Sequence, residues 1–194
     1  MMLAWLKQFG RSGSAVFLCL ALAACATPQK IGNNNGSQVF ERTGRFALNV
    51  TYHDNKQDAV QGGFAWQDDG RNLTLDLANP LGSTLARVDV VPGHAKLTRS
   101  NGATEQAPGP DALVELVLGS PIPVAGLRDW LRGRTGSSAT VQLEKNEAGQ
   151  ITGFEQNGWR VVLSRYDAQG PRLLQMNRNE AGRRISVRLV VDGQ

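Results

Sequence analysis

Arg45-Phe46-Ala47-Leu48-Asn49-Val50 places an apolar side chain at every second residue. Successive side chains of a β-strand point to opposite faces of its sheet, so a period of two predicts a strand with one apolar face. The same alternation occurs in residues 60–67 and again in residues 73–77. The chain is therefore expected to begin its folded part as a series of β-strands.

The alternation continues towards the C-terminus. Further strands are expected at residues 84–91, 95–99, 103–106, 139–144, 151–156, 159–166, 172–177 and 184–191. Turn-forming pairs such as Pro92-Gly93 and Asn101-Gly102 occupy the short connections, which indicates hairpins between antiparallel strands. The pattern thus predicts a mainly β chain with about eleven antiparallel strands.

Two segments in the middle of the chain break this rhythm. Residues 110–118 open on a proline and end before Gly119, and residues 124–132 end before Gly133, as short helices do. In the second segment Leu127, Trp130 and Leu131 fall on one helical face. Two short helices cannot cover both faces of a large sheet, so we expect one highly curved sheet whose concave face they partly cover.

The N-terminus has the pattern of a secretory signal peptide. Two basic residues precede an apolar stretch at residues 15–22, which is shorter than the roughly 20 residues that span a bilayer. Leu22-Ala23-Ala24-Cys25 resembles the lipobox of bacterial lipoproteins, which implies that residues 1–24 are removed and that Cys25 carries a covalent lipid. Ala26 is not the aspartate that retains such proteins in the inner membrane, so the resemblance implies the periplasmic face of the outer membrane. The alternative is an ordinary signal peptide with a chance cysteine.

Processing changes the composition of the chain. Residues 1–24 hold two of the 21 basic and none of the 17 acidic residues, so the formal charge falls from +4 to +2. The remaining basic residues form no run with stacking aromatics, which argues against nucleic acid. Cys25 with residues 26–38, rich in Gly and Asn, is interpreted as a lipidated, flexible tether, and residues 39–194 as one domain.

Few residues in the chain suggest catalysis. His53 and His94 lack partners at metal-ligand spacing, and the sequence has no nucleophile elbow or phosphate-binding loop. Asp68-Asp69 could form a carboxylate pair, but Gly70 follows it, so we interpret the pair as a solvated hairpin turn. We therefore expect no enzyme, no metal and no cofactor beyond the lipid on Cys25.

Three segments together resemble the LolB family of outer-membrane lipoprotein receptors over nearly the whole mature chain. They are Asn79-Pro80-Leu81-Gly82-Ser83-Thr84, Gly119-Ser120-Pro121-Ile122-Pro123 with the downstream Trp130, and Gln156-Asn157-Gly158-Trp159. The resemblance implies an incomplete, half-open antiparallel β-barrel of eleven strands with a helical lid. It also implies a monomer that takes lipoproteins from the soluble carrier LolA by their acyl chains and inserts them into the outer-membrane lipid.

Candidate residues for this function follow the two patterns. The concave face is expected to use Phe46, Leu48, Phe64, Trp66, Leu75, Leu77, Val88 and Val90, and the lid Leu113, Leu116, Leu127, Trp130 and Leu131. Taken singly, each of them is better explained by plain core packing, and periodicity does not show whether the interior is filled by side chains or left open for a ligand. For Leu81 in the Asn79-Pro80-Leu81-Gly82 loop, the sequence alone favours a turn leucine folded back on the core. The resemblance implies the opposite, because in LolB proteins the leucine of this loop protrudes and is needed to deliver cargo into the membrane.

Three rival functions predict different observations. A structural or assembly lipoprotein would bind a protein partner through the edge or face of its sheet, and it should show a filled barrel and no displaceable lipid. A soluble lipid carrier would share the cavity, but the lipid on Cys25 would stop it from shuttling. An acyl-processing enzyme would need a nucleophile beside a base, which covalent labelling by an acyl probe would reveal.

Overall fold

The computed structural model describes residues 39–119 and 122–193 of the 194-residue chain. The expected signal peptide, Cys25 and the tether lie outside these residues. The described residues belong to one compact unit.

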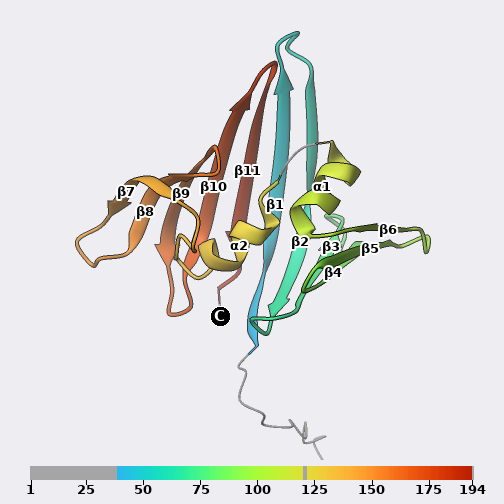
Figure 1. The fold of residues 1–194 in the computed structure, drawn as a ribbon, viewed down its shortest axis with the longest axis horizontal. Helices are drawn as coiled ribbons and strands as arrows, with labels where there is room; N and C mark the ends of the chain where they lie inside the picture. Colours follow the sequence, from blue (N-terminus) through green and yellow to red (C-terminus); the bar gives the residue numbers. More distant parts are fainter. Residues whose placement is uncertain (1–38, 120–121, 194) are drawn as a thin grey trace, which may run out of the picture. The chain divides into compact units, whose positions relative to one another are not determined.

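Eleven antiparallel strands make a single open sheet (Figure 1), in the order β6-β5-β4-β3-β2-β1-β11-β10-β9-β8-β7. The strands are β1 (Phe40–Tyr52), β2 (Gln57–Asp68), β3 (Leu73–Ala78), β4 (Thr84–Val91), β5 (His94–Arg99), β6 (Thr104–Ala107), β7 (Thr140–Lys145), β8 (Ile151–Gln156), β9 (Trp159–Tyr166), β10 (Pro171–Glu180) and β11 (Arg183–Val191). The edge strands β6 and β7 do not pair with each other in the described part of the chain. The predicted mainly β, half-open fold of about eleven antiparallel strands is confirmed.

Strand β1 lies at the centre and joins the two halves of the sheet. Gly44 in β1 is paired with Phe64 in β2 on one side and with Val191 in β11 on the other. A Cβ atom added to Gly44 would lie 2.2 Å from the carbonyl oxygen of Val190 and 2.9 Å from the Phe64 ring. Only glycine therefore fits where these neighbours meet. Strand β1 starts at Phe40, although its apolar alternation begins only at Phe46. The earlier inward positions hold Arg42 and Gly44, which have low hydrophobicity, so the sequence pattern does not show this part of the strand.

The helices α1 (Pro110–Leu118) and α2 (Val124–Trp130) lie over the same face of the sheet (Figure 1). Gly119 ends α1 in the left-handed conformation (φ 63°) and donates its N–H to the carbonyl oxygen of Glu115, as the sequence predicts. Asp111 in the first turn of α1 accepts a 2.7 Å hydrogen bond from the backbone N–H of Ala125, which ties the two helices together. No helix in the described residues is long and apolar enough to cross a membrane.

Buried side chains from both halves of the sheet and from both helices form one hydrophobic cluster. The sheet contributes residues such as Trp66 and Val88 from one half and Val161 and Met176 from the other. Leu113 and Trp130 reach the cluster from the helices. The core therefore lies between the helices and the inner face of the sheet, by which we mean the face that they cover.

Candidate functional site

Most of the residues expected on the concave face and the lid are buried in this cluster. Strand pairing places them side by side, because Leu75 in β3 is paired with Trp66 in β2 and with Val88 in β4. The buried candidates are Leu48, Phe64, Trp66, Leu75, Val88, Val90, Leu113, Leu127, Trp130 and Leu131, and Phe46 and Leu77 are partly buried against them. The sequence pattern thus brings these residues together on one apolar surface.

Leu116 is the exception among the candidates. Its side chain is 65% exposed, so it does not face the sheet as the lid assignment expected. Helix α1 packs against the core through Leu113, with Val114 and Val117 on one side of it. Leu116 lies on the opposite side of Leu113 around the helix and therefore remains in solvent. A helix that is apolar on more than one side does not reveal its packed face from sequence.

Trp130 fills the space between α2 and the sheet. It is fully buried, and its ring lies edge-on to that of Phe154 with the centroids 5.6 Å apart. Its indole N–H donates a 2.9 Å hydrogen bond to Oε1 of Gln156, whose amide in turn donates to the carbonyl oxygen of Ser138. In this structure side chains cover the inner face, so an acyl chain would have to displace helix side chains in order to enter.

A buried carboxylate anchors α2 to the end of β2. Asp68 is 1% exposed and accepts hydrogen bonds from Arg128 (2.7 Å) and Arg132 (2.8 Å) of the helix segment. Burial raises the pKa of Asp68, but the hydrogen bonds from the two arginines outweigh it, so the pKa lies below its ordinary value. The interpretation of Asp68-Asp69 as a solvated turn is therefore wrong for Asp68. Asp69 does lie in solvent, where Oδ1 accepts the backbone N–H of Arg71 and of Asn72.

A second ion pair ties β1 to the turn after β9. Arg42 is almost fully buried on the inner face and donates from both terminal nitrogens to the carboxylate of Asp167, at 2.7 and 2.8 Å. These hydrogen bonds lower the pKa of Asp167 to about 2, against a smaller opposite effect of burial. The sequence predicts neither of these ion pairs. Their signal is a charged residue at an inward position of an alternating strand.

We expect acidification to remove stability through these two carboxylates. Each has a folded pKa below its unfolded value of about 3.9, so its contribution is fully present above that value and is lost as the pH falls through the folded pKa, which for Asp167 is about 2. Urea unfolding followed by tryptophan fluorescence should show a falling free energy of unfolding between pH 5 and pH 2. Asp167→Asn should remove about 1–2 kcal/mol of that fall. An unchanged pH dependence in this variant would contradict the assignment.

The loop between β3 and β4 presents an exposed leucine. The side chain of Asn79 accepts hydrogen bonds from the backbone N–H of Leu81 (2.9 Å) and of Ser83 (3.0 Å), and Gly82 takes a positive φ of 89°. These bonds close a compact turn around Pro80, and the side chain of Leu81 at its tip is 92% exposed. The alternative of a turn leucine folded back on the core is therefore wrong.

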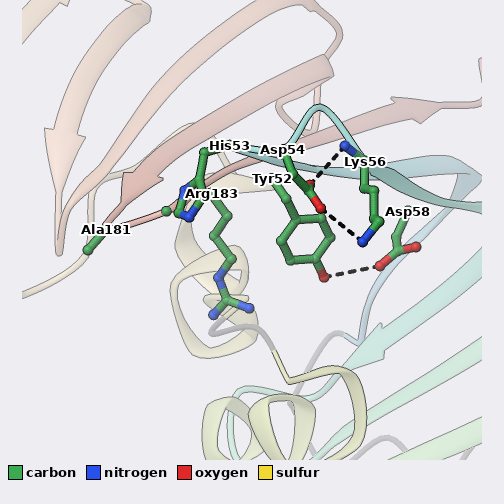
Figure 2. A pocket seen from close by; sticks show the side chains of 8 residues that line it. Tyr52, His53, Asp54, Lys56, Asp58, Ala181 and Arg183 are labelled. Atoms are coloured by element: carbon green, nitrogen blue, oxygen red, sulfur yellow. Dashed lines mark hydrogen bonds and ion pairs between the residues drawn. The ribbon is translucent and has the colours of Figure 1, made fainter.

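A hollow of about 620 Å³ lies between the β1–β2 turn and the β10–β11 turn (Figure 2). The backbone N–H of His53 donates a hydrogen bond to the carbonyl oxygen of Gly182, which holds the two turns side by side. Its polar groups largely bond to each other: the hydroxyl of Tyr52 donates to Asp58 at 3.0 Å, and Lys56 pairs with Asp54 at 2.9 Å. The lining consists of Tyr52, His53, Asp54, Lys56, Asp58, Ala181, Gly182 and Arg183. None of the candidate residues belongs to it, and we assign it no function.

The fold and the inner face define a class: a mainly β protein with one open antiparallel sheet, whose apolar face lies beneath two short helices. The family model described as "Outer membrane lipoprotein LolB" matches residues 38–193. The chain therefore belongs to the LolB family of outer-membrane lipoproteins, as the sequence motifs predict.

Two relatives matched by sequence agree with this assignment. The outer-membrane lipoprotein LolB of Bordetella pertussis is 57% identical, over 96% of this chain and 92% of the relative. The outer-membrane lipoprotein LolB of Cupriavidus necator is 38% identical, over 94% of this chain and 97% of the relative. Among solved structures, a LolA superfamily protein from Nitrosomonas europaea matches with a TM-score of 0.41 and 8% identity, over 79% of this chain and 87% of that one.

Proposed function

We propose that this protein is a receptor that accepts lipoproteins from the periplasmic carrier LolA, binds their acyl chains against the inner face and inserts them into the outer membrane. The observation that supports this most strongly is the continuous apolar face of the sheet beneath two helices. Family membership and the exposed Leu81 at the tip of a compact loop point the same way.

The physical need for such a surface is large. Transfer of one CH₂ group from water to an apolar surface gains about 0.8 kcal/mol, so a lipoprotein with acyl chains of about 16 carbons would lose tens of kcal/mol in water. An apolar interior replaces the bilayer during transfer. Hydrophobic contact is non-directional, so one surface serves many cargo proteins through the lipid that they share. Each step requires only that the next site binds the chains more favourably than the last, without nucleotide hydrolysis.

The hydrogen bonds and ion pairs that hold the two helices indicate which helix moves when an acyl chain enters. Helix α2 is held by the ion pairs of Asp68 and by the Trp130–Gln156 hydrogen bond, all of which involve buried groups. The C-terminal end of α1 is tied to the sheet by an exposed hydrogen bond, from Arg183 to the carbonyl oxygen of Gly119. Since Asp111 also ties the first turn of α1 to α2, we expect acyl chains to enter beside the C-terminal end of α1 while α2 stays in place.

A transfer assay tests the receptor role. LolA loaded with a triacylated lipoprotein is mixed with the soluble domain that begins at Gln29, and cargo on each protein is measured after separation. We expect the cargo to move to the domain, and the same cargo without acyl chains to remain unbound. If no cargo moves, the receptor role is rejected, and binding of non-acylated protein alone would favour an assembly lipoprotein.

A further inference from the structure

Two buried N–H groups on the inner face have no hydrogen-bond acceptor among the described residues: Nε1 of Trp66 and Nε of Arg42. Both residues are 2% exposed. They are directly opposite each other in the pairing of β1 with β2, so their side chains leave the sheet on the same face, with Cβ atoms about 5 Å apart. Buried N–H groups in native proteins are nearly always hydrogen-bonded, so two such neighbours require an explanation.

Trp130 differs from Trp66 in having a hydrogen-bond acceptor for its buried indole N–H. Trp130 also lies fully inside the cluster, and its N–H donates to Gln156 at 2.9 Å. The fold thus supplies an acceptor to the tryptophan that fixes α2. It supplies none to Trp66, which lies one inward position before Asp68 along β2.

We propose that Trp66 binds the ester carbonyl oxygen of an acyl chain through its indole N–H, with Nε–H of Arg42 as the second donor. This inference rests on the proposed function and deepens it, since it names the polar group that an otherwise apolar surface recognises. A carbonyl oxygen has two lone pairs and so accepts from two donors.

The charges around the site favour a neutral acceptor. The guanidinium of Arg42 is already compensated by two hydrogen bonds to Asp167. A carboxylate or phosphate at Trp66 would have to be desolvated, and the charge of Arg42 is no longer free to receive it. An ester carbonyl carries no charge, and its chain is apolar like Leu75 and Val88, the next inward residues across β3 and β4.

The surroundings also give the lipid a direction. A hollow of about 380 Å³, lined by Val39, Phe40, Arg132, Arg134 and Gln169, lies beside Phe40, one inward position from Arg42 on β1. With the carbonyl at Trp66, the head of the lipid faces this hollow. The hydrocarbon then runs along Phe64 and Leu77 towards the other end of β2.

Indole N–H resonances test the inference directly. The domain from Gln29 onward contains Trp66, Trp130 and Trp159, so labelling tryptophan with ¹⁵N gives one indole signal for each, and Trp66→Phe assigns the first. Methyl decanoate is the probe, and decyl methyl ether, which lacks the carbonyl oxygen, is its matched control. We expect the ester to move the Trp66 indole proton downfield and the ether not to do so, while the Trp130 signal keeps the shift of a bonded N–H.

Affinity provides the second readout. We expect the parent domain to bind the ester at least about fivefold more tightly than the ether, since one hydrogen bond contributes about this much. Trp66→Phe should lower this ratio, because only the Nε–H of Arg42 remains as a donor, whereas Phe64→Leu should weaken both probes equally and keep the ratio. Equal binding of ester and ether by the parent, or an unchanged ratio in Trp66→Phe, would overturn the inference and leave the receptor role standing. If neither probe binds, it is the proposed acyl-chain binding that fails.

Discussion

Asp68→Asn is expected to lower the free energy of unfolding by about 3 kcal/mol, near the lower end of the cost of breaking a buried ion pair. The carboxylate is almost fully buried and receives charged hydrogen bonds from both Arg128 and Arg132. Asparagine keeps the shape but removes the charge and one acceptor oxygen. The two arginine side chains are about a quarter exposed, so water can solvate part of their charge in the variant. The loss of stability should therefore stay below the upper end of the cost of breaking a buried ion pair.

Urea unfolding at neutral pH, followed by tryptophan fluorescence, measures this loss. Asp69→Asn is the matched control, because Asp69 lies next in sequence and accepts its two backbone hydrogen bonds through Oδ1, which asparagine retains. We expect this control to stay within about 0.5 kcal/mol of the parent. If Asp68→Asn unfolds like the control, the buried ion pairs do not hold α2 in place.

The strands were predictable because one physical constraint governs most of them. Most strands of the open sheet have one face against the core, so their apolar residues recur with a period of two; the edge strand β7 is the exception, since its side chains are largely exposed. The expected strand at residues 159–166 coincides with β9, and the one at 84–91 with β4. The helix ends were predictable as well, since Pro110 and Gly119 begin and end α1 through local backbone preferences.

The polar anchors could not be predicted in the same way. Arg42 and Asp167 are separated by 125 positions in the sequence, and Asp68 and Arg128 by 60. Periodicity shows that Arg42 and Asp68 point inward, but it carries no information about which distant residue neutralises each of them. The turn-forming residues that follow Asp68 led to its interpretation as part of a solvated turn, although Asp68 is the last residue of strand β2.

The interior also shows a limit of sequence patterns. The same alternation describes a surface open to a ligand and one filled by Trp130 and Leu131. The exposure of Leu81 has a local cause, the two hydrogen bonds to Asn79, although the sequence alone favours a leucine that folds back on the core. Structure was needed to separate these cases.

Leu81→Glu is expected to reduce the delivery of lipoproteins into a bilayer roughly 10- to 100-fold, with stability and acyl-chain uptake unchanged. A leucine side chain that enters lipid gains about 1.5–3 kcal/mol, and a charged carboxylate forfeits this gain. The side chain is 92% exposed and contributes nothing to the core, so the free energy of unfolding should not fall. Weak insertion of this size suits a loop that contacts the membrane briefly for each delivery.

The measurement is the rate at which cargo moves from the loaded domain into liposomes. Leu143→Glu is a matched control, because Leu143 in β7 is also an exposed leucine, at 49%, but belongs to the edge strand rather than to the β3–β4 loop. Loss of delivery in Leu81→Glu alone would assign the effect to insertion of this loop. Equal loss in both variants would indicate that surface charge is responsible, and equal delivery by Leu81→Glu and the parent would remove Leu81 from the mechanism. The hydrogen bonds of Asn79 hold the leucine outward before any membrane is met, so the loop does not need to reorganise to make this contact.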